Sequence, residues 1–150
     1  MFDVHARIIE SDGTTVALDF NDHTAGLVLV SHQEPEENVR HIRTSAARVD
    51  GSFSVAQASD DGFLTLIVRV SGSTWAECMS RWEAARAAYR AESHFYIEVE
   101  AEGVTTRWRT ERPDVAPAGS DASALANKRQ TYSLRFRVQP HPTVTFPEEP

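Results

Sequence analysis

The sequence predicts a mostly β fold of the α+β class, an antiparallel β-sandwich or barrel with one flanking helix. Apolar and polar residues alternate in short runs along most of the chain, as in strands that bury one face. Turn signals such as Asp12-Gly13 and Asp50-Gly51 separate these runs. One segment, near residues 74–90, carries apolar residues at helical spacing instead.

Size and composition indicate one domain and exclude several classes of protein. The chain has 150 residues, 41% of them apolar, and a chain of this length buries roughly 70% of its unfolded surface. Its net charge of −7 argues against a partner held mainly through its phosphates. The single cysteine, Cys78, allows neither an intrachain disulfide nor a cysteine-based metal site. The sequence shows neither a membrane span nor a signal peptide, so intracellular synthesis is the expectation.

The N-terminal part is predicted to form a hairpin, a short strand and a loop. Residues 2–9 and 14–20 flank a Ser11-Asp12-Gly13 turn, and residues 26–31 form a short apolar strand. The polar stretch 32–48 has weak periodicity and is predicted to be a long mobile loop. Such loops are usually functional or ordered by a partner, and a tolerated insertion is the alternative.

The next two strands are predicted at residues 52–58 and 63–70, joined by the Asp60-Asp61-Gly62 turn. Phe63 and Ile67 lie on one face of the second strand, and this favours a central strand covered on both sides. Its other face is uniformly apolar and consists of Leu64, Leu66, Val68 and Val70.

One helix is predicted from Thr74 to about Arg90. Thr74 and Glu77 form a T-x-x-E capping box, in which each side chain satisfies an amide at the helix start. Favourable ion pairs are expected between Glu77 and Arg81 and between Glu83 and Arg86. An apolar stripe at this spacing is far more often the seam that packs a helix onto a sheet than a ligand site. The stripe consists of Trp75, Cys78, Met79, Trp82, Ala85 and Tyr89.

The last third returns to strands. Residues 95–100 and 104–109 alternate around the Ala101–Gly103 turn and predict a hairpin, and residues 132–138 predict a strand with one apolar face. Between them, about residues 111–130, we expect a second long loop rich in Pro, Ala, Ser and Asp. The single domain then spans residues 1–142, and a Pro-rich extended tail, residues 143–150, cannot enter a sheet interior.

The sequence contains no catalytic or metal-binding motif. The six histidines are scattered singly, and the motifs of serine hydrolases, phosphate loops and dinucleotide sites do not occur. Cys78 lies on the apolar stripe, where an inert structural thiol is expected. We therefore expect no enzyme, no cofactor and no metal. A hydrolase with a carboxylate pair is the weakest hypothesis, because the spacing of the acidic residues gives it no support.

Charge is distributed unevenly along the chain. Residues 1–103 carry 8 basic and 17 acidic side chains, whereas residues 104–139 carry 7 basic and 3 acidic ones. Opposite charges on neighbouring strands could pair within the sheet. Alternatively, acidic and basic faces could meet between copies in a head-to-tail ring. The candidate subunit contacts are Glu34, Glu36, Glu37, Arg40, Arg43, Arg48, Glu98, Glu100, Arg107, Arg109, Arg135 and Arg137.

A hypothesis of another class is a monomeric binding module that stacks a small ligand on aromatic side chains. It requires at least one exposed tryptophan among Trp75, Trp82 and Trp108. The absence of active-site motifs, the two long polar loops and the charge separation together favour an assembly protein.

The order of elements from Asp50 to Pro142 resembles the tail-tube-like domain of long-tailed bacteriophage tail proteins. The similarity is strongest to the N-terminal domain of distal tail proteins and to small minor tail proteins of actinobacteriophages. The segments that carry it are the strand opening at Val49-Asp50-Gly51, the strand Phe63–Val70, the Ser71–Trp75 turn into the helix, the hairpin Phe95–Arg109, the polar loop, and the closing strand that ends in Pro140-His141-Pro142.

The resemblance implies a virion protein that assembles as a hexameric ring around a channel through which DNA passes. Channel walls in such tubes tend to be acidic, which suits a net charge of −7. A long loop between early strands, here residues 32–48, contacts the neighbouring or stacked ring. The implied partners are other copies and neighbouring tail proteins (tube, tape measure, or tip and hub), with DNA as passing cargo and no membrane.

Distal tail proteins carry a second, receptor- or carbohydrate-facing domain, which this sequence lacks after Pro142. This departure puts the assignment to the distal ring in question, and the distal or minor tail ring is nevertheless the first expectation. The major tail-tube subunit and the tail terminator remain as alternatives.

Overall fold

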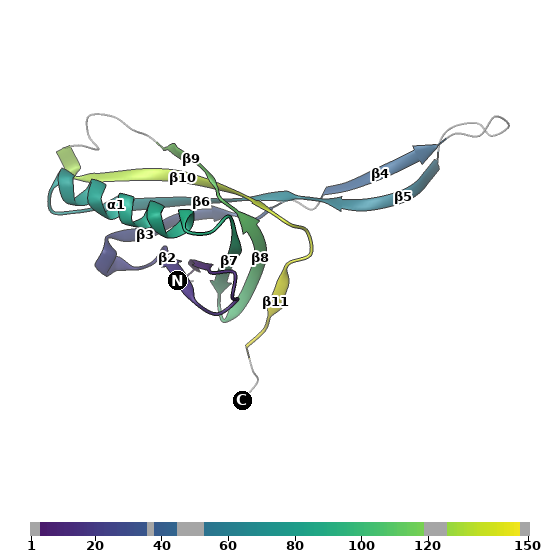
Figure 1. Ribbon diagram of the computed structural model, residues 1–150, viewed down its shortest axis with the longest axis horizontal. Helices are drawn as coiled ribbons and strands as arrows, with labels where there is room; N and C mark the ends of the chain where they lie inside the picture. The colour runs from purple at the N-terminus through teal and green to yellow at the C-terminus, as the bar shows by residue number, and fades with distance from the viewer. Residues whose placement is uncertain (1–3, 36–37, 45–52, 119–125, 148–150) are drawn as a thin grey trace.

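Antiparallel strands make up most of the structure, and one α-helix lies against them (Figure 1). The computed structural model describes residues 4–35, 38–44, 53–118 and 126–147. The predicted α+β class with a predominance of strands is confirmed. The elements are β1 (Val4–Ile9), β2 (Val16–Asp19), a short 3-10 helix η1 (His23–Ala25), β3 (Leu27–Gln33), β4 (Asn38–Thr44), β5 (Phe53–Asp60), β6 (Gly62–Ser71), α1 (Trp75–Arg90), β7 (His94–Ala101), β8 (Val104–Glu111), β9 (Asp114–Pro117), β10 (Arg129–Val138) and β11 (Thr143–Thr145).

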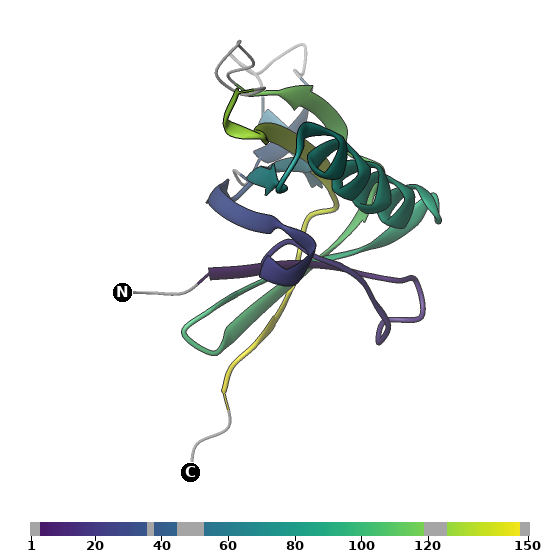
Figure 2. The same cartoon turned by 90° about the vertical axis from the view of Figure 1, so that its left-hand side faces the viewer.

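The strands form one large sheet and a separate two-stranded ribbon. The large sheet has the order β2-β1-β7-β8-β10-β6-β3, with β11 paired to β8 and β9 paired to β10. Strands β8 and β10 meet at a single residue pair, Thr110 and Val138. The sheet folds over at this junction, so that its two parts run in different directions and their inner faces share one core (Figure 2).

Strand β6 confirms the predicted apolar face and corrects the prediction for the opposite one. It lies between β10 and β3, so it is central. Phe63 on its outer face is nevertheless 36% exposed and Ile67 is half-buried, because no helix or second sheet layer covers this face in the described structure. The inner face is fully buried and consists of Leu64, Leu66, Val68 and Val70. Burial of each such side chain contributes roughly 1.5–3 kcal/mol.

Helix α1 buries its predicted stripe in the core. Thr74 caps the helix by accepting a hydrogen bond from the amide of Glu77, 3.1 Å away. The Glu77 carboxylate accepts from the amide of Ser73, at 3.1 Å, so the return bond of the capping box is displaced by one residue. Both predicted ion pairs are present, Arg81 with Glu77 at 2.7 Å and Arg86 with Glu83 at 2.8 Å. No helix in the described part of the chain is long and apolar enough to cross a membrane.

The predicted long loop at residues 32–48 is wrong where the structure describes it. Strand β3 extends to Gln33, and residues 38–44 form β4, which pairs with β5. The pairs Gln33–Thr65 and Asn38–Asp60 share one register, so the β4–β5 ribbon continues the β3–β6 ladder beyond the large sheet. Figure 1 shows the ribbon projecting away from the helix and the sheet. Strand β5 (Phe53–Asp60) confirms the strand predicted at residues 52–58. Residues 38–44 lack the apolar alternation that would have predicted β4, because a ribbon outside the core needs no apolar face.

The second predicted loop, at about residues 111–130, also contains a strand. Residues 114–117 form β9, which pairs with β10 from Tyr132 to Arg135. Proline at both ends made this segment look irregular, but proline is compatible with an edge strand. Residues 119–125 of this loop lie outside the described residues.

The tail after Pro142 is attached to the sheet. Residues 143–145 form β11, which pairs with Thr105–Arg107 of β8. All three residues of β11 are exposed. The tail thus adds a strand at the margin of the sheet, consistent with the expectation that its prolines keep it out of the interior.

Candidate functional site

The outer face of the first part of the sheet carries a row of polar residues, four of them charged, that crosses five strands. The register places Asp19 of β2, Arg7 of β1, Glu98 of β7, Arg107 of β8 and Thr143 of β11 directly opposite one another. We call these five residues the charged row. Charges alternate from Asp19 to Arg107, so each neighbouring pair is attractive.

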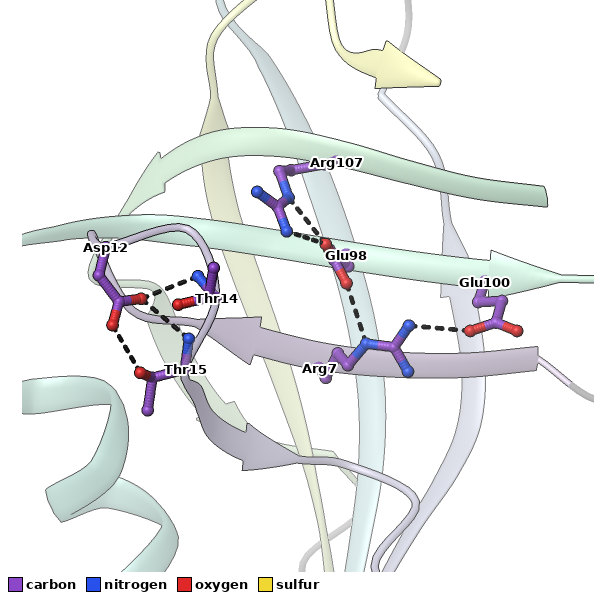
Figure 3. Close-up of polar contacts among 7 residues, drawn as sticks. All are labelled: Arg7, Asp12, Thr14, Thr15, Glu98, Glu100 and Arg107. Carbon is purple, nitrogen blue, oxygen red and sulfur yellow. Dashed lines mark hydrogen bonds and ion pairs between the residues drawn. The ribbon is translucent and has the colours of Figure 1, made fainter. Parts of the chain in front are cut away.

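Glu98 is the centre of the charged row (Figure 3). Its Oε2 accepts a hydrogen bond from Nε of Arg7 at 2.9 Å, and its Oε1 accepts from Nε of Arg107 at 2.7 Å and also from Nη2 of Arg107. Arg7 donates through Nη2 to Glu100, 2.8 Å away. The two guanidinium groups leave Glu98 only 7% exposed, although it lies on an outer sheet face.

The surroundings of Glu98 keep it charged. Burial raises the pKa of this carboxyl, but hydrogen bonds and positive charge from Arg7 and Arg107 lower it further than burial raises it, so the pKa is below its usual value. The pKa of Arg7 is raised, because Glu98 and Glu100 outweigh the effect of its burial. This arrangement holds a fixed ion pair network and offers no group poised for proton transfer at neutral pH.

The β1–β2 turn lies against the charged row. Asp12 accepts hydrogen bonds from the amides of Thr14 at 2.8 Å and Thr15 at 2.9 Å. Together with the Thr15 hydroxyl, these bonds lower the pKa of Asp12 to about 2. Gly13 has a φ of +80°, and a Cβ there would lie 3.5 Å from Nη1 of Arg107. The turn predicted from Ser11-Asp12-Gly13 therefore packs next to Arg107 (Figure 3).

The outer face of the second part of the sheet is basic. Arg135 and Arg137 of β10 are exposed beside Phe63 of β6, with their guanidinium carbons 3.6 and 5.9 Å from the centre of its ring. Arg69 lies on the same face of β6, by the two-residue period of the strand. We call Phe63, Arg69, Arg135 and Arg137 the basic face. The guanidinium groups of Arg135 and Arg137 make cation–π contacts with the Phe63 ring, which therefore lies at the surface instead of in the core.

The candidate contact residues are distributed over several parts of the fold. Glu98, Glu100 and Arg107 pair within the sheet, which is the first of the two accounts that the charge pattern left open. Arg135 and Arg137 lie on the basic face, and Arg109 lines a small hollow of about 160 Å³ together with Arg137. Glu34 is exposed just after β3. Arg40 and Arg43 belong to β4, whereas Glu36, Glu37 and Arg48 lie outside the described residues.

Arg7 is the residue of this network that sequence reasoning missed. It is the only Lys or Arg among the first 39 residues, and this was the one feature of the sequence that could have marked it. Its partners are more than 90 residues away, at Glu98 and Glu100. Only the pairing of β1 with β7 brings them together, and alternation along a strand does not reveal which strand is its neighbour.

The aromatic side chains give little support to a stacking site built on tryptophan. Trp82 and Trp108 are 3% and 4% exposed, and Trp75 is half-buried. The Cys78 thiol is buried in the core, and burial raises its pKa. No three His, Cys, Asp or Glu side chains gather as a metal site would require within the described residues.

No protein-family model and no curated protein sequence matches the chain. Solved structures do match. A chain of the phage P2 baseplate in its activated conformation with Ca has a TM-score of 0.67 and 9% identity, covering 91% of this chain and 44% of that chain. The Dit (gp 19.1) protein of phage SPP1, described as a paradigm of the hub adsorption apparatus in Gram-positive infecting phages, has a TM-score of 0.62 and 12% identity, covering 92% and 50%.

These likenesses establish the fold. The class of fold that the sheet and helix define is the one found in phage baseplate and hub adsorption proteins, and the resemblance to phage tail proteins inferred from the sequence is confirmed at this level. The chain spans about half the length of the solved chains that it matches.

Proposed function

We propose that this chain is a structural protein of a phage tail and forms a ring at the distal end of the tail, in or next to the baseplate. The observation that carries the proposal is the fold match, which extends over 91–92% of the chain in two different phages. Both matched proteins belong to a baseplate or an adsorption hub, and this favours a distal position over a tube subunit or a terminator.

The β4–β5 ribbon supports assembly from several copies. An isolated two-stranded ribbon is marginally stable in water, and this one forms a sheet of its own outside the large sheet. A neighbouring subunit would cover it and stabilise it. We infer that the ribbon, with Arg40 and Arg43 on β4, reaches the next copy or the next ring.

The basic face supplies a second contact surface. Arg135 and Arg137 are exposed, lie over the Phe63 ring and do not belong to the charged row. In a head-to-tail ring they would meet acidic side chains of the adjacent copy, and complementary charge would fix the register. A hexameric ring of this kind would enclose the channel for DNA and would contact the neighbouring tail proteins.

The solution mass of the purified chain tests this proposal. Light scattering across protein concentration and ionic strength should give a mass near six protomers, and negative-stain images should show rings. Charge-mediated contacts predict that the rings dissociate as salt rises. A strict monomer under all of these conditions would contradict self-assembly.

A further inference from the structure

A groove of about 490 Å³ lies between helix α1 and strand β9. Its floor is Tyr132, whose ring stacks on Trp82 with centroids 3.9 Å apart and planes 6° from parallel. Val115, which is 36% exposed, and Pro117 form the β9 side. Trp82 belongs to the core and Tyr132 packs against it, so the Tyr132 ring is the aromatic surface at the base of the groove.

Three arginines surround this apolar floor: Arg86, Arg90 and Arg112. Arg112 is fixed by donating to the carbonyl of Arg90 at 2.7 Å, and Arg86 is paired with Glu83 at 2.8 Å. Arg90 makes no ion pair with any described residue. Asp114 is the one carboxylate among the lining residues, so the groove has a positive rim in a protein whose net charge is −7. Guanidinium groups in this setting favour carboxylates.

Strand β9 gives the groove a third property. It pairs with β10 along one side, and no other described strand pairs with its second side. All four of its residues are exposed. An edge of this kind presents backbone groups to an incoming strand, and recognition by strand addition combines such backbone bonds with pockets for side chains.

We propose that the groove between α1 and β9 binds an extended acidic peptide segment of another protein. The segment adds as a strand along β9, places an apolar side chain on Tyr132, and directs its carboxylates toward Arg86 and Arg90. This goes beyond the ring proposed above and does not depend on it, since a monomeric chain would bind the peptide equally well.

A labelled peptide that alternates glutamate with valine and has phenylalanine at its centre serves as the probe. Fluorescence anisotropy with the full chain should show saturable binding. Arg90→Glu should weaken it by about fivefold to tenfold, because an attractive charge becomes repulsive. Val115→Asp should weaken it similarly by placing a carboxylate in the apolar wall. Arg137→Glu makes the same charge change on the basic face, outside the β9–β10 pairing, and should leave the affinity unchanged.

Several outcomes would overturn the proposal. Equal losses from Arg90→Glu and Arg137→Glu would show unspecific attraction to exposed arginines, and absence of binding by the parent chain would exclude the site. Unchanged binding by a peptide with N-methylated valines would rule out strand addition. Displacement of the peptide by an equal concentration of a short thymidine oligonucleotide would favour a nucleic acid as the occupant. Thermal melting followed by circular dichroism checks that each variant is folded, with Arg90→Ala as a milder replacement.

Discussion

The Glu98 carboxylate links three neighbouring strands through its hydrogen bonds. It lies on β7 and accepts hydrogen bonds from Arg7 of β1 and Arg107 of β8, while its own exposure falls to 7%. Replacing Glu98 with glutamine should lower the free energy of unfolding by about 1–3 kcal/mol, because it weakens all three charge-assisted bonds that the carboxylate accepts. The matched change Glu100→Gln removes a single bond to Arg7, which is more exposed than those of Glu98. It should lower the free energy of unfolding by less than about 1 kcal/mol. Urea unfolding of the two variants measures the difference, and equal losses would contradict a central role for Glu98.

The same carboxylate should make stability depend on pH. The pKa of Glu98 is lowered in the folded state, so its contribution is present above its unfolded pKa, near 4.5, and is lost as the pH falls through the lower folded value. We expect the urea midpoint of the parent to decrease between about pH 5 and pH 3, and the decrease to be smaller in Glu98→Gln. Other acidic groups, such as Asp12 and Glu77, also have lowered pKa values and contribute to both curves alike. Parallel curves for the two proteins would show that Glu98 is not responsible.

Among the elements, the β4–β5 ribbon is the one whose role can be separated from folding. Because it pairs in a sheet of its own, the core should not need it. Joining Pro35 to Phe63 through an Asn-Gly turn should keep the β3–β6 register of Gln33 with Thr65 and leave the melting temperature within a few degrees of the parent. The same deletion should abolish the rings, as measured by light scattering. A deletion variant that still forms rings would remove the ribbon from the proposed interface.

The elements also show what a sequence can and cannot predict. Strand β6, helix α1 and the β7–β8 hairpin were predicted correctly, because each buries a periodic apolar face in the core. Strand β5 was predicted at residues 52–58, whereas β4 and β9 were missed because their sequences lack a clear apolar periodicity. The charged row could not be predicted from periodicity alone, because the pairing of β1 with β7 depends on how the whole sheet folds. The groove could not be predicted at all, because its residues come from α1, β9 and β10.

At the scale of the whole molecule, we expect the charged row to contribute to folding and the basic face to form the proposed contact between copies. Arg107 belongs to the charged row, where its charge is already satisfied by Glu98. Arg107→Glu would place two carboxylates directly opposite each other, and we expect it to lower the free energy of unfolding by at least about 2 kcal/mol. A loss of assembly in this variant would therefore not identify an interface.

Arg135 belongs to the basic face, where it covers Phe63 and is exposed. Arg135→Glu should change the free energy of unfolding by no more than about 1 kcal/mol, the size of a cation–π contact at an exposed site. If the basic face docks on acidic side chains of the next copy, the same change should raise the concentration needed for ring formation about tenfold or more, with the largest effect at low salt. Sedimentation of parent and variant across a concentration series measures this directly. Rings that form at the parent's concentration even when Arg135 and Arg137 are both glutamate would show that the basic face has another use, and would leave the β4–β5 ribbon as the contact between copies.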